Sequence, residues 1–300
     1  MKHLQDFVFI EAVMRAGSIR KAAEDMNITA SALNRRINRF ETEFGSEIFE
    51  RLPRGVRLNP AGELLIQHIR AQRSELARLQ SQVADLSGQR RGHVSIACSQ
   101  ALLPYFLPDQ IAQYRRAHPG VTFNVNVRDR VEAEEELRDF HSDIALVFEP
   151  RHLAEFEVIY TATQPVHAVM RVDNPLASQK EVRLRECLNH PHVVPSAQYA
   201  VRVLLEDAVR EATSVKIHPA VEAESFDFMR HYVLHENAVA FQFPIGLKTG
   251  GDPRIVSRPV SARDVTPGTL LLGQLRGRTL PVASARFMQQ LSTALLAHEA

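Results

Sequence analysis

The chain has 300 residues, which is enough for two or three domains that each have a core. Its composition is that of an ordinary globular protein, and the formal net charge of +1 excludes nucleic-acid binding by bulk attraction, so that a local basic patch would be needed. Charged residues such as Lys2 and Asp6 interrupt the N-terminal segment, which therefore lacks a secretory signal, and no apolar run approaches the roughly 18 residues of a membrane helix. We expect a cytoplasmic protein without a membrane partner.

The first 45 residues predict three helices separated by short breaks. Residues 3–15 place apolar side chains on one helical stripe, which Gly17 ends. Ser18 is a suitable N-cap for a second helix, and Thr29 is a suitable N-cap for a third helix, which Gly45 ends. The third helix has apolar side chains at intervals of four, three and four residues, so one of its faces is predicted to be buried.

The other face of the third helix carries side chains that suit DNA. Two helices joined by a tight turn within about 30 residues form a helix-turn-helix, whose second helix enters the major groove. Arginine makes a bidentate contact to guanine and asparagine makes one to adenine, so Asn34 and Arg35 are the predicted base readers. Arg36 and Arg39 are better placed for phosphates, which fix the register of the protein on the duplex without reading sequence.

A hairpin follows the third helix. The segment "IFERLPRGVRLNPAG" (residues 48–62) has short apolar pairs on either side of Pro53-Arg54-Gly55, a pattern that predicts two strands and a turn. Arginines on this hairpin suit a neighbouring phosphate backbone or a minor groove. The predicted partner is double-stranded operator DNA, and the predicted DNA-binding residues are Ser18, Thr29, Ala30, Ser31, Asn34, Arg35, Arg36, Arg39, Arg51 and Arg54.

A long helix is predicted from residue 63 to about residue 88. Asn59-Pro60 is a strong helix start, and the apolar positions that follow alternate in steps of four and three, with Gln72 as the single polar member. That spacing predicts the seam of a short coiled coil between two chains. The alternative is a helix packed on its own domain. The predicted dimerisation residues are Leu65, Ile69, Leu76, Leu79, Val83 and Leu86.

The pattern changes after the polar segment "SGQRRG" (residues 87–92). Short β-rich runs such as "HVSIAC" and "DIALVF" alternate with helical stretches, which predicts an α/β architecture with βαβ units. Ligands of such folds bind at the carboxyl ends of the strands. Polar residues at the junctions between strands and helices are therefore the candidates for a ligand site.

Two junctions of this kind predict an effector site. Ser99 and Gln100 follow the first strand, and Ser196 and Tyr199 follow a later one; the helix starts beside them would suit a carboxylate. The two serines are also ordinary N-cap candidates, and capping does not exclude ligand binding. Arg128 is either a partner for an acidic ligand or a plain surface arginine. The predicted effector-binding residues are Ser99, Gln100, Arg128, Phe148, Ser196, Tyr199 and Phe226.

Other functions find less support in the sequence. His231 and His235 are spaced for one helix face, but two ligands make only half of a zinc site. Cys98 lies in an apolar strand, where a small buried side chain is expected. The basic neighbours of Cys187 favour a lowered thiol pKa. Metal sensing and redox sensing stay as alternatives. No nucleophile–base pair or Gly-rich phosphate loop predicts an enzyme. We expect no cofactor, no metal site and no catalytic residue. A free solute-binding protein would lack the helix-turn-helix.

At this point a family resemblance is clear. Residues 4–65 resemble the DNA-binding domain of LysR-type transcriptional regulators in "FVFIEAVMRAGSIRKAAEDMNIT", "ALNRRINRFETEFGSEIFER" and "VRLNPAGELL", and the likeness continues over nearly the whole chain. The resemblance implies an α-rich winged helix-turn-helix followed by an α/β, two-lobed sensor like type 2 periplasmic binding proteins. The implied parts are a DNA-binding domain (1–62), a linker helix and hinge (63–91) and a sensor (92–300), whose first lobe is about 92–162 plus 268–300 and whose second is about 163–267.

The resemblance also implies how such a regulator works. It implies a homodimer or homotetramer that binds operator DNA, responds to a small-molecule inducer, here expected to bear a carboxylate, and acts on RNA polymerase. The start of the third helix departs from the family pattern, because "TASA" (residues 29–32) places Ala30 where a glutamine is usual. Asn34 stands where a serine is usual. The family's binding mode is therefore expected here, but not its base preference.

Overall fold

The structure is a computed structural model of the 300-residue chain. It describes every residue except 1, 87–90, 150–154, 212–215, 248–250 and 300, and among those described it does not place the side chains of 2–4, 84–86 and 299. The chain divides into two compact units, residues 1–77 and 78–300, and each unit is described by itself.

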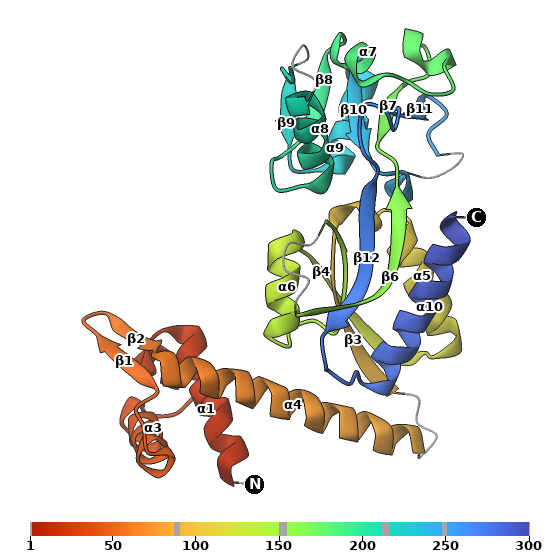
Figure 1. The fold of residues 1–300 in the computed structure, drawn as a ribbon. Coiled ribbons are helices and arrows are strands. Elements are labelled where there is room, and N and C mark those ends of the chain that lie inside the picture. The colour runs from red at the N-terminus through yellow and green to blue at the C-terminus, as the bar shows by residue number, and fades with distance from the viewer. Residues whose placement is uncertain (1, 87–90, 150–154, 212–215, 248–250, 300) are drawn as a thin grey trace. The chain divides into compact units, whose positions relative to one another are not determined.

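The N-terminal unit begins with three helices (Figure 1), whose bounds are α1 (Lys2–Ala16), α2 (Ile19–Asp25) and α3 (Ala30–Phe44). The predicted caps are present. The Ser18 hydroxyl accepts a hydrogen bond from the Lys21 amide at 3.4 Å, and the Thr29 hydroxyl accepts one from the Ala32 amide at 3.3 Å. Gly45 follows α3 with a φ of 82°, a left-handed conformation that glycine adopts without strain.

A hairpin and the first part of a long helix complete this unit. The strands β1 (Phe49–Leu52) and β2 (Gly55–Leu58) pair antiparallel, and the Glu50 carboxylate accepts a hydrogen bond from Arg57 at 2.7 Å across the ladder. Helix α4 (Pro60–Leu86) begins with the Asn59 side chain accepting the Gly62 amide at 2.9 Å. A Cβ on Gly62 would lie 2.1 Å from the Ile48 carbonyl oxygen, so only glycine allows α4 to approach the hairpin this closely.

The core of the N-terminal unit includes the first turns of α4. Leu65 and Ile69, predicted as coiled-coil positions, are buried with Ile10, Val13 and Ile37 in one hydrophobic cluster. They are therefore unavailable to a second chain, and the seam prediction is wrong for these two positions. For the rest of the row, Leu76, Leu79 and Val83 are exposed, and the side chain of Leu86 lies outside the described part of the chain.

The C-terminal unit contains two five-stranded sheets (Figure 1). The first sheet has the order β4-β3-β5-β12-β6, with bounds β3 (Arg91–Cys98), β4 (Gly120–Val127), β5 (Ile144–Phe148), β6 (Phe156–Gln164) and β12 (Gly268–Leu275). Helix α6 covers one face, and two helices cover the other; their bounds are α5 (Phe106–Ala117), α6 (Arg130–Arg138) and α10 (Val282–Glu299). Alternate residues of β3 and β5 enter different hydrophobic clusters because both faces of this sheet are covered.

The second sheet has the order β11-β7-β10-β8-β9, with bounds β7 (His167–Arg171), β8 (His192–Pro195), β9 (Val221–Ala223), β10 (Val239–Gln242) and β11 (Ile255–Pro259). Its helices are α7 (Leu184–Leu188), α8 (Ala200–Glu211) and α9 (Phe226–His235). The short helices of the unit are η1 (Gln100–Leu102), η2 (Pro175–Ser178) and η3 (Pro244–Gly246). The predicted two-sheet α/β fold is confirmed.

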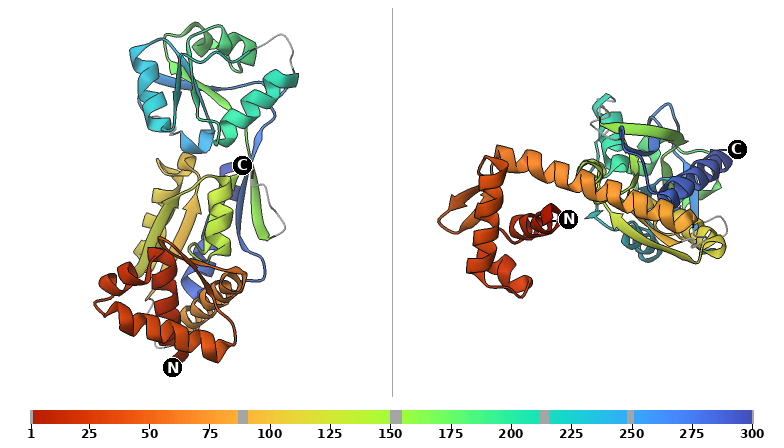
Figure 2. Two further views of the ribbon diagram at one scale, coloured as in Figure 1. Left: turned by 90° about the vertical axis from the view of Figure 1, so that its left-hand side faces the viewer. Right: turned by 90° about the horizontal axis from the view of Figure 1, so that it is seen from below.

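The chain crosses between the two lobes twice. One connection follows β6 at residues 165–166, and the other precedes β12 at residues 260–267. Figure 2 shows the two connecting segments along the same side of the sheets. Such a paired connection allows the lobes to rotate about it as rigid bodies. None of the described helices is both long enough and apolar enough to span a membrane.

Candidate DNA-binding surface and inter-lobe cleft

The face of α3 opposite its buried side chains carries four polar residues. Ser31, Arg35 and Asn38 are exposed and Asn34 is half-buried. Their spacing of three, one and three residues places them on one side of the helix, since residues three and four apart are neighbours. Asn38 is a surface residue that the sequence analysis missed, although it lies seven positions after Ser31 and the helical period alone indicates it.

Two of the predicted DNA-contacting arginines contact side chains of their own unit. The Arg36 guanidinium lies over the Phe9 ring of α1, with 4.8 Å from its carbon to the ring centroid. The Arg39 guanidinium lies 3.5 Å from an oxygen of the buried Asp6 carboxylate and 3.7 Å from Glu43. Both arginines therefore brace α3 against α1, which leaves Arg35 as the arginine on the outer face of the helix.

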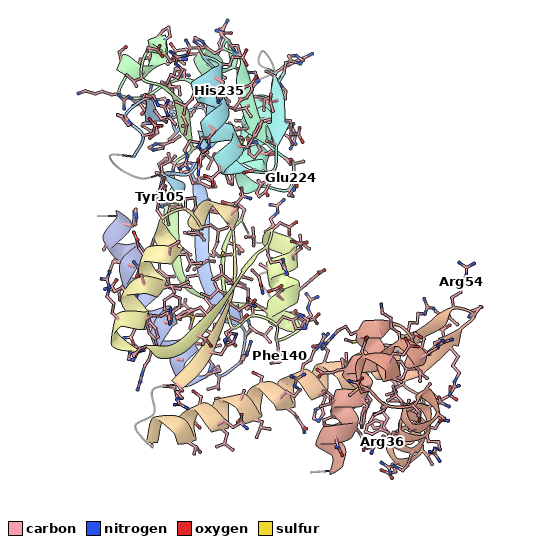
Figure 3. The ribbon with its side chains drawn as sticks, turned by 180° about the vertical axis from the view of Figure 1, so that it is seen from behind. Arg36, Arg54, Tyr105, Phe140, Glu224 and His235 are labelled. Atoms are coloured by element: carbon pink, nitrogen blue, oxygen red, sulfur yellow. The ribbon has the colours of Figure 1, made fainter. Side chains whose placement is uncertain are left out.

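The start of α3 and the hairpin hold the other predicted positions. The Ser18 and Thr29 hydroxyls accept the helix-start amides described above, Thr29 also lies 3.3 Å from the Ser31 hydroxyl, and Ala30 is exposed at the first helical position. Arg54 stands at the tip of the hairpin, pointing away from the helices (Figure 3). A tip arginine of this kind suits a phosphate or a narrow groove.

A small cavity lies between the two lobes of the C-terminal unit. Its volume is about 20 Å³, room for about one water molecule. Five of the predicted effector residues line it, whereas Gln100 and Ser196 lie outside the lining; the five are Ser99, Arg128, Phe148, Tyr199 and Phe226. Strand-end positions from both lobes thus converge on one point.

Three contacts close this cleft. The Gln100 side-chain oxygen accepts the Phe226 amide at 2.8 Å, so that a lobe 1 side chain caps the lobe 2 helix α9. Arg230 on α9 donates to the Tyr105 hydroxyl at 2.7 Å, and Figure 3 shows Tyr105 on the side of lobe 1 that faces lobe 2. The Phe148 and Phe243 rings stack with their centroids 4.0 Å apart. Tyr105, Arg230 and Phe243 could not be identified from sequence, because no local pattern marks them.

Arg128 and Arg130 have different surroundings in the cleft. Arg128 donates from Nε to the buried Glu136 carboxylate at 2.6 Å, and its charge is balanced there. Burial by itself raises the pKa of Glu136, but hydrogen bonds from Ser142, Asn126 and Arg128 outweigh it and hold that pKa below its usual value. Arg130, which the sequence analysis missed, has only a long bond of 3.4 Å to the Glu149 carbonyl and no carboxylate partner among the described residues.

Comparison with known proteins decides the family. Residues 4–63 match the family model described as "Bacterial regulatory helix-turn-helix protein, lysR family", and residues 87–296 match the model described as "LysR substrate binding domain". The chain belongs to the LysR family of transcriptional regulators. The predicted regulator class is confirmed, and the family consists of sequence-specific DNA-binding regulators rather than enzymes.

Individual relatives agree with this LysR assignment. The chain is 23% identical to the transcriptional activator CmpR of Synechocystis, and the match covers 77% of this chain and 75% of CmpR. It is 27% identical to the transcriptional regulator CbbR of Sinorhizobium medicae, over 77% of this chain and 74% of CbbR. Among solved structures, a full-length Pseudomonas aeruginosa OxyR variant matches with a TM-score of 0.67 at 20% identity, covering 97% of this chain and 94% of OxyR.

Two further LysR-family structures include bound molecules. Full-length CbnR in complex with its target DNA matches with a TM-score of 0.64 at 15% identity, over 97% of this chain and 99% of CbnR. The regulatory domain of Synechocystis CcmR in complex with 2-PG matches with a TM-score of 0.60 at 14% identity, over 68% of this chain and 98% of that domain. At these identities the likeness shows the fold.

The metal and redox alternatives are not favoured for this LysR regulator. The His231 Nδ1 donates to the Asp227 carbonyl oxygen at 2.7 Å, and the described residues contain no group of three or more metal-ligating side chains. Burial raises the pKa of the Cys98 thiol to about 12 and is the main cause that raises that of Cys187 to about 12. The basic neighbours of Cys187 in sequence do not lower its pKa, because burial and the Glu186 and Asp264 carboxylates raise it.

The outer face of α3 leads to a first prediction. Replacing Arg35 with alanine should cost roughly 1–3 kcal/mol of binding at the specific operator and relax base preference there. Arg54→Ala should weaken binding to all duplexes evenly and reduce the dependence of affinity on salt. Titrations of operator and random duplexes at several salt concentrations measure both effects. If Arg35→Ala bound both duplexes with wild-type affinity, Arg35 would not be a base reader.

Proposed function

We propose that this LysR regulator binds a small anionic metabolite, expected to bear a carboxylate, between the two lobes of its C-terminal unit. The observation that carries the proposal is the cavity lined from both lobes, with the Arg130 guanidinium beside it and no carboxylate paired with it among the described residues. The Asp129 carboxylate also lines the cavity, but it accepts two backbone amides at the start of α6. The Arg130 cation therefore favours an anion, because the electrostatic attraction is stronger in a desolvated cleft than in water. Ser99, Tyr199 and Gln198 supply polar groups beside it.

A ligand larger than water requires the lobes to move apart, since the cavity holds only about 20 Å³. The bond between Gln100 and the Phe226 amide and the bond between Arg230 and Tyr105 stabilise the closed form without a ligand. A ligand that binds one lobe arrangement more tightly shifts the equilibrium by that difference in affinity. The regulatory signal is therefore the angle between the lobes.

The relatives support the remaining parts of the proposal. CcmR was solved with 2-PG and CbnR with its target DNA, which supports an effector and an operator for this chain as well. The row of exposed apolar residues on α4, Leu76, Leu79 and Val83, supports pairing of two chains. We propose a cytoplasmic homodimer or homotetramer that affects RNA polymerase at its operator.

The inducer proposal predicts a specific loss. A thermal-shift screen of the full-length protein with mono- and dicarboxylates and small phosphorylated acids should give a stabilising ligand. Arg130→Ala should weaken its binding about tenfold to a hundredfold, since a hydrogen bond to a charged group contributes about 1.5–3 kcal/mol. Ser99→Phe should fill the cavity and abolish binding. Calorimetry measures the ligand affinity of each variant.

Arg138→Ala provides the control on the same helix. Arg138 is exposed, pairs with Glu155 and lies outside the cavity lining, so its loss should leave ligand affinity unchanged. All variants should still bind DNA. Wild-type ligand affinity in Arg130→Ala and Ser99→Phe would place the effector elsewhere, and a screen in which no acid stabilises the protein would contradict an anionic inducer.

A further inference from the structure

The hairpin contacts the recognition face of α3 through one arginine. Arg51 on β1 donates from Nη2 to the Asn38 side-chain oxygen at 3.0 Å, and the Asn34 side-chain oxygen lies 3.5 Å from the same nitrogen. A guanidinium has only donors, so each amide must turn its oxygen, and not its NH₂ group, toward Arg51. The chemistry of the contact therefore fixes the orientation of both amides.

The NH₂ groups of the two asparagines are consequently turned away from Arg51. They have no hydrogen-bond partner among the residues that the structure describes, and they share a helix face with the exposed Arg35. We propose that Arg51 is a positioning residue: it holds Asn34 and Asn38 so that they present donors to the major groove. The face of α3 then offers donors from three neighbouring side chains.

This arrangement changes the expected base preference. The bidentate contact of asparagine to adenine needs the amide oxygen to accept a hydrogen bond from adenine N6. That oxygen faces Arg51 here, which corrects the expectation that Asn34 reads adenine. Guanine presents two acceptors in the major groove and thymine presents one, whereas cytosine presents a donor. Adenine presents one acceptor, N7, but its N6 donor would find no acceptor on an asparagine whose oxygen faces Arg51. The bases facing Asn34 and Asn38 should therefore be guanine or thymine.

The hairpin does not depend on Arg51 for its attachment to α3. The Glu41 carboxylate accepts the Ile48 amide at 2.9 Å and the Phe49 amide at 3.3 Å, which fixes the start of β1 against the end of α3. Arg51 itself is exposed, so its replacement removes no buried group. Variants at Arg51 should fold, and they release the amides without releasing the hairpin.

The test is a selection from a pool of random duplexes with the full-length protein, followed by sequencing. The wild type should enrich guanine or thymine at the positions under Asn34 and Asn38. Arg51→Ala should admit adenine there, reducing discrimination by about tenfold per position. Arg51→Lys, which keeps a cationic donor, should retain most of the preference. Asn38→Asp keeps an acceptor for Arg51 but has no NH₂ group, so it should lose the preference at its own position.

Arg54→Ala is the matched control, because Arg54 lies at the tip of the same hairpin and points away from the helices (Figure 3). It should lower affinity for every duplex and leave base preference unchanged. A result in which Arg51→Ala behaves like Arg54→Ala would make Arg51 an ordinary phosphate contact and overturn the proposal. Enrichment of adenine by the wild type at either position would also overturn it. Melting curves verify that each variant is folded.

Discussion

Replacing Asp143 with alanine is expected to lower the free energy of unfolding of the C-terminal unit by about 3–5 kcal/mol, the usual cost of breaking a buried ion pair. Asp143 lies 2.5 Å from Arg278, whose side chain is only 6% exposed. Its other carboxylate oxygen accepts the Ser95 amide at 3.2 Å and the Ser284 hydroxyl at 2.8 Å. The substitution leaves the Arg278 charge buried with its carboxylate partner removed.

Burial lowers the pKa of Arg278, and Asp143 opposes that shift, which indicates that the environment alone disfavours the cation. Urea unfolding of the full-length protein, monitored by a spectroscopic signal from the C-terminal unit, measures the change in the free energy of unfolding. Asp207→Ala is the control, because the Asp207–Arg210 pair is exposed and should contribute little. The double variant Asp143→Leu with Arg278→Met should lose less than Asp143→Ala. If Asp143→Ala and Asp207→Ala lowered the free energy of unfolding equally, the buried pair of Asp143 and Arg278 would not have the proposed stabilising role.

Leu79→Lys is expected to separate the two chains of the proposed dimer and lower operator affinity by about a hundredfold or more, because two linked DNA-binding units gain affinity of that order over one. Leu79 lies on α4 between Leu76 and Val83, and the three side chains are 40–57% exposed. Exposed apolar side chains in one helical row are expected at an interface with another chain. A lysine in that row would be buried without a partner, which is costly.

Sedimentation velocity on the full-length protein measures the association, and titration of an operator duplex measures the affinity. Ala77→Lys is the control, since Ala77 is exposed on α4, is not three or four positions from any member of the row, and receives the same charge outside it. It should leave both measurements unchanged. An intact dimer with normal operator binding in Leu79→Lys would show that this row does not join two chains.

The sequence alone predicted most of the local structure and the family. Ser18, Thr29, Asn59 and Gly45 are capping residues, and their effect depends on a few neighbouring amides. The apolar period of α3 likewise assigned its buried and exposed faces, including the place of Arg35. These features can be predicted from the sequence because the interactions that produce them join residues only three or four positions apart.

The tertiary structure decided which of the candidate side chains are available for function. Arg51 and Asn38 are 13 positions apart, and Gln100 and Phe226 are 126 positions apart, so no local pattern indicates that they meet. Leu65 and Ile69 have the coiled-coil spacing, yet the fold buries them in the core of their own unit. Arg128 and Arg130 look equivalent in sequence, but only Arg128 has Glu136 beside it. Charge pairing and burial depend on the distance in space between segments, and that distance is set only when the whole chain has folded.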